Sequence, residues 1–463
     1  MLAVLVMTFT KIPSGLFSIH KAFQKGSKRT SLTQQRTYLS SNPSLPNSFP
    51  WHSYLAGPDQ YWNFSSLWNT VFQLESPIGK NLGFAHNYSF YGSREMYLYC
   101  VRNGTLYRSK KNPPIMKGRG RTFEDLTSSS LDMVRRVAGS HYETSIDPRL
   151  KELSTESFPF FLDAGDFWSC KNKTFPFFSF ATFEKETPGE KCIPIAIPSY
   201  DQWYHGKDVS TEWDFQFEKQ DKKYMWDSKI NKAVWRGAAT GLPESFPNWQ
   251  DLPRANLVKM SLDYPNMLDA GFKGASQRSK SEQNEMKSMG YMKKRMNIDD
   301  FQKYKAIIDI DGNSWSSRFF RLMCMNSVVL KVQPTHIDYF FPELKPWVHY
   351  LPVHANLSNL LDVVRLAVSE DQETMHRMQS IVRNANDWCK EKVTLESMAS
   401  DMMWIMISYI EILRKENLWS DSFSKWKTNM FSDEKAWNED WVKIPTFQKH
   451  HTYKEKRRRK NNS

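Results

Sequence analysis

Arginine, lysine and hydroxyl side chains gather in two stretches of the chain, each just after a short apolar run. In the first stretch, KAVWRGAATG at 232–241, the apolar run ends at Arg236 and Gly237. The second stretch follows the apolar run 306–310, and its candidate ligands are Gly312, Asn313, Ser314, Ser316, Ser317, Arg318 and Lys331. Guanidinium groups, hydroxyls and loop N–H groups bind phosphate oxygens well. We therefore predict that the two stretches bind a diphosphate.

Both stretches have the pattern of a strand, a loop and a helix. In the second stretch, the strand 306–310 leads to a helix opening at Ser317-Arg318, and another strand, 328–330, ends at Lys331. Open α/β sheets bind ligands at the carboxyl ends of their strands. A helix that begins there adds free N–H groups and the positive end of its dipole. The pattern predicts a βαβ unit with a phosphate site in its loop.

The first stretch is expected to position its arginine in the same way. A helix is predicted at about 254–262, with Asp251 as its N-cap and Pro253 in its first turn. Gly237 would allow the backbone to approach a ligand without an intervening side chain. A purely structural role for the two arginines becomes less probable if both loops face one crevice.

Acidic residues follow a third apolar run, in FPFFLDAGDFWS at 158–169. A carboxylate that follows a strand can act as a general base and remove the proton of an attacking hydroxyl. We take Asp166 as the candidate general base, and Asp163, three residues earlier, as its competitor. Both residues could instead be loop acids that face solvent.

Two other patterns offer competing chemistry. Asp309 and Asp311 form a DxD-like triplet whose carboxylates could bind Mg²⁺ or Mn²⁺. Strand alternation is the simpler explanation for that spacing. His205 and His349 are isolated in the sequence, and each is expected to be a hydrogen-bonded structural histidine rather than a base.

The letters WRG at 235–237, DGNSWSSR at 311–318 and FFPELKPWVHYLPV at 340–353 resemble those of a known family. The chain is similar, over about residues 90–415, to Rumi-type protein O-glucosyltransferases and fungal capsule-associated xylosyltransferases. The resemblance implies an inverting α/β enzyme of the GT-B type, in which two Rossmann-like domains face a central cleft. Asp166-Phe167 matches the family's catalytic Asp-aromatic pair, although Gly165 stands where the family often has arginine.

The resemblance also implies the reaction. Glucose or xylose would pass from a UDP-sugar to a Ser/Thr hydroxyl of a protein or to a glycan, without a metal cofactor. A non-catalytic sugar- or protein-binding relative with the same fold is the alternative. Asp166 together with the two arginine loops favours the enzyme, because a binding protein does not need a base.

Five segments are expected. Residues 1–50 form a targeting segment and basic linker, and 51–198 form the acceptor-side domain with an N-terminal elaboration. Residues 199–390 form the UDP-sugar-binding domain, in which 200–229 links the two halves. Residues 391–418 form a helix that returns to the first domain, and 419–463 form an aromatic and then basic tail. Within the first domain, Asn103-Gly104 predicts a hairpin turn.

The net charge of +13 does not indicate a nucleic-acid-binding protein. Residues 1–50 contain six Lys/Arg and no Asp/Glu, and residues 449–463 contain seven Lys/Arg and one Glu. The tails therefore carry twelve of the thirteen net charges. A nearly neutral body does not provide the broad basic face that binds a phosphate backbone.

The five cysteines and the N-terminus bear on the compartment. No cysteine lies in a CxxC motif, which argues against a zinc site. Cys324 is expected to be a buried thiol in an apolar helix, whereas Cys170 and Cys192 could pair in an oxidising lumen. The apolar run near Met1 is too short to span a bilayer, but it could serve as a weak signal or a shortened anchor. Six Asn-x-Ser/Thr triplets and the resemblance favour the lumen of the endoplasmic reticulum or Golgi.

Overall fold

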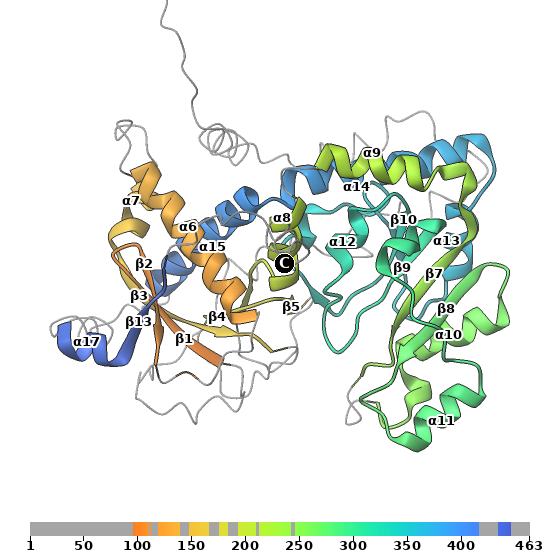
Figure 1. Cartoon of the computed structure of the whole chain (residues 1–463), viewed down its shortest axis with the longest axis horizontal. Coiled ribbons are helices and arrows are strands. Elements are labelled where there is room, and N and C mark those ends of the chain that lie inside the picture. The colour runs from red at the N-terminus through yellow and green to blue at the C-terminus, as the bar shows by residue number, and fades with distance from the viewer. Residues whose placement is uncertain are drawn as a thin grey trace, which may run out of the picture. The chain divides into compact units, whose positions relative to one another are not determined.

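The computed structural model describes an α/β protein with two main sheets (Figure 1). All of the described residues belong to one compact unit within Ser65–Ser463. The residues that the structure describes are 96–110, 112, 119–138, 148–165, 176–183, 193–209, 213–241, 246–415 and 434–445. The predicted α/β class is therefore confirmed.

The first sheet is mixed, with strand order β13-β2-β1-β3-β4-β6. Its strands are β1 (Met96–Arg102), β2 (Thr105–Ser109), β3 (Ser157–Asp163), β4 (Pro176–Ser179), β6 (Ile193–Ala196) and β13 (Trp441–Lys443). The predicted hairpin between β1 and β2 is confirmed, with φ of 47° at Asn103 and 63° at Gly104. Positive φ at both central residues is typical of a turn that matches the twist of a hairpin. β3, β4 and β6 pair in parallel.

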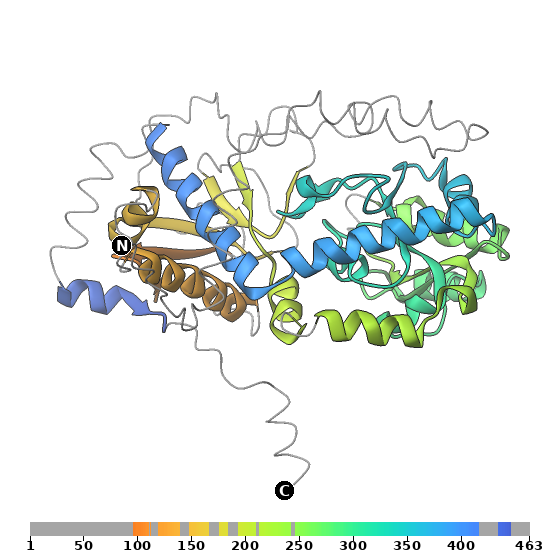
Figure 2. The same cartoon turned by 90° about the horizontal axis from the view of Figure 1, so that it is seen from above.

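Helix α15 (Leu395–Lys415) packs against this sheet and against α6 (Arg119–Ala138), as Figure 2 shows. Tyr409 of α15 lies among the aromatic rings of the sheet, with its ring centroid 5.1 Å from that of Phe178 and 6.0 Å from that of Phe158. Its hydroxyl donates a hydrogen bond of 3.2 Å to the carbonyl oxygen of Pro159. A helix late in the chain therefore completes the core around the first sheet.

The second sheet is entirely parallel, with strand order β12-β10-β9-β7-β8. Its strands are β7 (Ile230–Ala238), β8 (Leu268–Gly274), β9 (Tyr304–Asp309), β10 (Val328–Val332) and β12 (Leu351–Val353). The strands predicted at 306–310 and 328–330 are confirmed. Because β7 lies between β8 and β9, successive connections leave it in opposite directions. This point between β7 and β9 is the switch point at which such sheets bind ligands.

Helices cover the second sheet, including α10 (Pro253–Asp263) beside β8 and α14 (Gln372–Lys392) beside β10. Two further helices are α12 (Phe319–Met323) and α13 (Leu360–Ala367), and α11 (Lys280–Ser288) follows β8. Residues 372–415 are almost entirely helical. This stretch is divided into α14 and α15 at Val393, which ends α14.

The segment expected to link the two halves contains two helices, α8 (Tyr200–Val209) and α9 (Trp213–Lys223). Near it, β5 (Thr182–Phe183) pairs in antiparallel fashion with β11 (His336–Ile337). Gln202 of α8 donates a hydrogen bond of 3.2 Å from Nε2 to Oδ1 of Asp338, which follows β11. The region is thus a structured contact and not only a linker.

Part of the segment expected to be a tail also has regular structure. Residues 434–440 form α17 (Glu434–Asp440), and β13 pairs with β2 at the edge of the first sheet. Trp437 and Trp441 stack with their ring centroids 5.0 Å apart, and both are buried beside Cys100. Apolar burial by these two indoles explains why the aromatic part of the segment folds onto the sheet.

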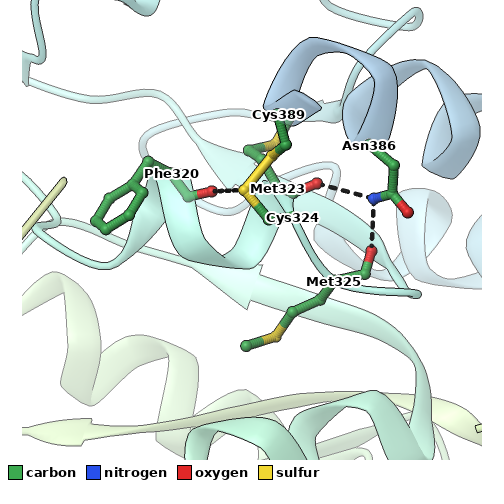
Figure 3. The surroundings of a disulfide bond; sticks show 6 residues. All are labelled: Phe320, Met323, Cys324, Met325, Asn386 and Cys389. Atoms are coloured by element: carbon green, nitrogen blue, oxygen red, sulfur yellow. Dashed lines mark hydrogen bonds between the residues drawn. A yellow bond between two sulfur atoms is a disulfide. The ribbon is translucent and has the colours of Figure 1, made fainter. Parts of the chain in front are cut away.

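A disulfide joins Cys324, which ends α12, to Cys389 of α14, with a Cα–Cα distance of 5.6 Å (Figure 3). The expectation that Cys324 is a free buried thiol was therefore wrong, because α14 places its partner across the helix interface. Asn386, on the same helix, donates from Nδ2 to the carbonyl oxygens of Met323 and Met325. Linking residues 65 positions apart stabilises the fold by about 4 kcal/mol in the chain-entropy treatment.

Cys170 and Cys192, whose pairing was left open, lie outside the described residues. Cys100 is buried, and its thiol donates a hydrogen bond of 3.3 Å to the carbonyl oxygen of Val101. Among the described helices, none combines the length and apolar character needed to cross a membrane.

Candidate functional site

The loops that follow β7 and β9 lie side by side at the switch point, and Arg254 of α10 holds them together. Its Nη1 donates to the carbonyl oxygen of Ala238 (3.0 Å) and to Oγ1 of Thr240 (2.6 Å) in the first loop. Its Nη2 and Nε donate to the carbonyl oxygens of Ile310 (3.0 Å) and Asp311 (2.7 Å) in the second loop. The two stretches singled out from the sequence therefore meet at one edge of the sheet.

The close approach of Arg254 also explains Gly312. A Cβ atom at this position would lie 3.0 Å from Nη2 of Arg254 and 3.1 Å from Oγ1 of Thr240. Burial lowers the pKa of Arg254 to about 9, so that its guanidinium is still charged at neutral pH. Sequence reasoning did not identify Arg254 as part of the site, because an arginine in the first turn of a helix has no distinguishing pattern.

Asp309, Asp311 and Lys331 form a buried ionic network at the carboxyl ends of β9 and β10. Nζ of Lys331 lies 2.7 Å from Oδ2 of Asp309 and 3.0 Å from Oδ1 of Asp311. Burial alone would lower the pKa of Lys331, but the two carboxylates outweigh it and raise that pKa. The hydroxyl of Ser316 donates to Oδ1 of Asp309, and the N–H of Thr335 donates to Oδ2 of Asp311.

This network gives several predicted ligands a different role. Lys331 neutralises the carboxylates and is 2% exposed, so its ammonium group is engaged before any phosphate arrives. The hydroxyl of Ser316 orients the loop through Asp309. The spacing of Asp309 and Asp311 follows from strand and loop positions that both face Lys331.

Arg318 ends the second loop and contacts the first, and one of its guanidinium nitrogens has no hydrogen-bond partner among the described residues. Its Nη1 donates to the carbonyl oxygen of Arg236, which connects the second loop directly to the end of β7. Its guanidinium carbon lies 5.8 Å from the centroid of the Trp235 ring. Its Nη2 has no hydrogen-bond partner among the residues that the structure describes. Burial lowers the pKa of Arg318, and the nearby carboxylate of Asp309 opposes that shift.

Arg236 has a carboxylate partner instead. Its Nη2 lies 2.8 Å from Oδ1 of Asp269 at the start of β8, and its Nη1 donates to the carbonyl oxygen of Asp269. Lys293 and the hydroxyl of Tyr304 also contact the Asp269 carboxylate, both at 2.6 Å. Burial would raise the pKa of Asp269, but hydrogen bonds from Lys293 and Tyr304 and the charge of Arg236 lower it to about 2.

The side chain of Trp235 leaves no room for a side chain at position 237, so glycine is required there. A Cβ atom there would lie 2.3 Å from the indole of Trp235, which folds over the backbone at the end of β7. Trp235 is fully buried. The glycine thus makes room for an indole, which is a sufficient reason for its presence whether or not a ligand approaches.

The helix at the second loop is shorter than expected. It begins at Phe319 and has five residues, with Arg318 as its N-cap. The N–H of Phe319 already donates to the carbonyl oxygen of Ser316 at 3.0 Å. The predicted supply of free helical N–H groups is therefore smaller than we expected, because the turn before the helix uses one of them. The first helix, α10, has Leu252 and not Asp251 as its N-cap, and Pro253 is in its first turn as predicted.

The remaining loop residues surround the same point. Ser314 is buried, whereas Asn313 and Ser317 are half-buried. Oδ1 of Asn313 and Nε1 of Trp315 are buried atoms without hydrogen-bond partners among the described residues. The ring of Trp315 lies 6.3 Å from that of Phe180, which follows β4 in the first sheet. The second loop therefore contacts the carboxyl end of a strand in the other sheet.

The candidate base, Asp166, lies outside the described residues. Its competitor Asp163 ends β3, opposite Ser179 of β4, and is fully buried. Oδ1 of Asp163 accepts a hydrogen bond of 3.0 Å from the N–H of Gly165. That bond fixes the start of the loop that leads to Asp166, and burial keeps the Asp163 carboxylate away from a substrate in solution.

The two histidines lie in packed surroundings. Nδ1 of His349 accepts a hydrogen bond from the N–H of Lys345, and the ring of His205 packs 5.6 Å from that of Phe320. Burial lowers the pKa of each to about 4.

The KPWVHY letters form the turn that precedes β12, in which Trp347 has a φ of 67°. The most specific motif of the sequence thus lies at the amino end of a strand.

Comparison with known proteins finds one family and several relatives of that family. The model of glycosyl transferase family 90 matches residues 162–445. Protein O-glucosyltransferase 3 of Rattus norvegicus is 35% identical over 150 residues, which are 32% of this chain and 26% of that protein. Protein O-glucosyltransferase 1 of Homo sapiens is 30% identical over 165 residues, which are 35% of this chain and 39% of that protein. The match thus spans between about a quarter and two-fifths of these relatives.

Proposed function

Since the chain belongs to glycosyl transferase family 90, we propose that it transfers glucose or xylose from a UDP-sugar to a hydroxyl of a protein or a glycan. The observation that carries the proposal is the meeting of two cation-bearing loops at the switch point of a parallel sheet. Ligands bind at such points because loops diverge there and leave a crevice. The names of the relatives, which are protein O-glucosyltransferases, favour glucose and a protein acceptor.

In this proposal, Arg318 stabilises the departing diphosphate. Its partnerless Nη2 is a charged donor, and hydrogen bonds from a permanent cation to phosphate are among the stronger ones in proteins. Gly312, Asn313, Ser314 and Ser317 would supply backbone and side-chain donors around the same phosphates. Charge develops on the leaving oxygen as the glycosidic bond breaks, so donors held in place lower the barrier.

Asp166 is proposed to accept the proton of the attacking hydroxyl, with inversion at the anomeric carbon. Two observations on neighbouring residues support this role. The carboxylate of Asp163 anchors the start of the loop. The adjacent strand β4 leads to Phe180, which contacts Trp315 of the proposed donor loop. The contact of Phe180 with Trp315 supports a proposed GT-B arrangement, in which the carboxyl end of β4 would face the donor loops.

The reaction is proposed to take place in the lumen of the endoplasmic reticulum or Golgi. The Cys324–Cys389 disulfide supports an oxidising compartment, because cytosolic thiols are kept reduced. The chain would be held there by a signal or an anchor at its N-terminus.

Transfer by an Asp166→Asn variant tests the proposal. UDP-glucose and UDP-xylose would be supplied with a protein acceptor, and both transfer and UDP affinity would be measured. We expect UDP affinity near that of the wild type and transfer reduced by about 100-fold or more, the usual scale for loss of a general base. Asp163→Asn serves as the matched control. If it loses transfer while Asp166→Asn retains it, the base is Asp163. A wild-type protein that binds UDP but transfers neither sugar would favour the non-catalytic alternative.

A further inference from the structure

A β-bulge lies at the carboxyl end of β7 and β8, beside the proposed donor site. Gly237 pairs with Phe272, but Ala238 pairs with Gly274, so Lys273 is the extra residue on β8. Bulges re-aim a side chain and are common next to active sites. Lys273 is exposed, and a Cβ atom at the adjacent Gly274 would meet no atom within 4 Å. The bulge therefore presents a lysine beside open space.

A second exposed cation reaches the same edge from the other side of β8. Lys293 donates its N–H to the carbonyl oxygen of Phe272, and Phe272 donates its N–H to Tyr291, so this segment runs along β8 in parallel. Arg295 follows two residues later, in the direction in which β8 ends, and it is exposed. The segment thus places Arg295 near the carboxyl end of β8.

The electrostatics of the edge agree with this placement. Partial burial lowers the pKa of Lys273, and the positive charges of Arg318, Arg295 and Arg254 lower it further. Like charges that lie close together repel one another, so their convergence costs stability unless an anion joins them. Arg318 belongs to the second loop, and Arg254 of α10 donates hydrogen bonds to both loops.

We propose that Lys273 and Arg295 extend the donor site and bind phosphate oxygens of the nucleotide diphosphate. The proposal rests on the proposed function. It adds two cations to those that the two loops offer to the diphosphate of the substrate. Lys273 approaches from the bulge after Phe272, and Arg295 approaches from the strand beside it. Together they would neutralise negative charge of the diphosphate beyond the part that Arg318 neutralises through its partnerless Nη2.

Calorimetric titration of the full chain with UDP tests this assignment. Lys273→Ala and Arg295→Ala should each weaken UDP binding by about tenfold, which corresponds to about 1.4 kcal/mol. Binding of uridine, which has no phosphate, should not change in either variant. Lys273→Arg should recover most of the affinity, because it retains the charge. Inorganic pyrophosphate should compete with UDP in the wild type and less well in the two alanine variants.

Lys294→Ala is the matched control, since Lys294 is an exposed lysine that directly precedes Arg295. We expect this variant to bind UDP as the wild type does, and thermal melting should show that all variants are folded. The proposal is overturned if both alanine variants bind UDP within twofold of the wild type. In that case the proposed function stands whenever the wild type still binds UDP and transfers sugar. A wild type that does not bind UDP would overturn the proposed function and this assignment together.

Discussion

Arg236 and Arg318 were both predicted to bind the diphosphate, yet their surroundings differ. Arg236 is paired with Asp269, whose carboxylate also contacts Lys293 and Tyr304. Arg318 donates to a backbone carbonyl oxygen, and its Nε lies 4.0 Å from Oδ1 of Asp309, a carboxylate that Lys331 contacts more closely at 2.7 Å. A guanidinium that is hydrogen-bonded to a carboxylate already has its charge compensated, whereas one whose nearest carboxylate is farther away and shared with a lysine favours a further anion. The neighbouring strand, and not the local motif, decides which case applies.

The largest expected effect is on stability, in an Arg236→Ala variant. Its loss would leave Asp269 partly buried with one fewer cation, and breaking such a pair typically costs about 3–5 kcal/mol. Because Lys293 still contacts Asp269, we expect the lower end of that range. Urea denaturation measures the free energy of unfolding.

A double variant, Arg236→Met with Asp269→Leu, sharpens the result. It removes both charges, so it should be more stable than Arg236→Ala. If Arg236→Ala is instead as stable as the wild type and fails to bind UDP, then Arg236 is a donor ligand and the contrast with Arg318 is lost.

The next effect is on ligand affinity, in an Arg318→Ala variant. We expect UDP binding to weaken by about 1.5–3 kcal/mol, the scale of hydrogen bonds to charged groups. Calorimetry provides the measurement. Arg318→Lys should restore only part of the affinity, because an ammonium group does not bind two phosphate oxygens as a guanidinium does. Unchanged UDP affinity in folded Arg318→Ala protein would remove the arginine from the donor site.

The same contrast explains what the sequence could and could not predict. Apolar runs predicted β9 and β10 because burial of both faces requires continuous apolar residues. The sequence also predicted the two polar loops, because ligand-binding residues in open α/β sheets lie at the carboxyl ends of the strands. The partner of Arg236 could not be found, since Asp269 is 33 residues away and its register depends on the whole sheet. Arg254 and the Cys324–Cys389 pair were missed for the same reason.

A smaller effect follows from a comparison of two half-buried aspartates. The partners of Asp269 lower its pKa to about 2, whereas burial raises the pKa of Asp401 in α15 to about 7. Lys392 opposes the shift of Asp401, but Oδ2 of Asp401 has no hydrogen-bond partner within the described part of the chain. Folded protein therefore retains a proton at Asp401 that the unfolded chain releases near pH 4.

Asp401 should consequently make the protein less stable as the pH rises from about 4 to about 7. Asp401→Asn removes this dependence and should be more stable than the wild type at pH 8, by about 1 kcal/mol or more. Urea denaturation at pH 5 and pH 8 measures the difference. Equal pH dependence in the variant and the wild type would contradict the assignment of the shift to Asp401. Asp269 acts in the opposite direction, because its contribution is lost only as the pH falls below about 4.

The smallest expected effect is that of a chelator. Lys331, Ser316 and Thr335 already contact the carboxylates of Asp309 and Asp311, so these oxygens are poorly placed to bind a divalent cation. We expect EDTA to leave the transfer rate unchanged within error. Turnover that EDTA abolishes and Mn²⁺ restores would make the two aspartates metal ligands and would separate Lys331 from them.

The pairing of β13 with β2 has a consequence for synthesis of the chain. Lys110, just after β2, donates a hydrogen bond to the carbonyl oxygen of Asn438 across 328 residues. While the ribosome is still making the chain between them, β2 has an edge with unpaired N–H and C=O groups, and such edges pair readily with other strands. We therefore expect that chaperones must cover the edge of β2 in the nascent chain until β13 has been made.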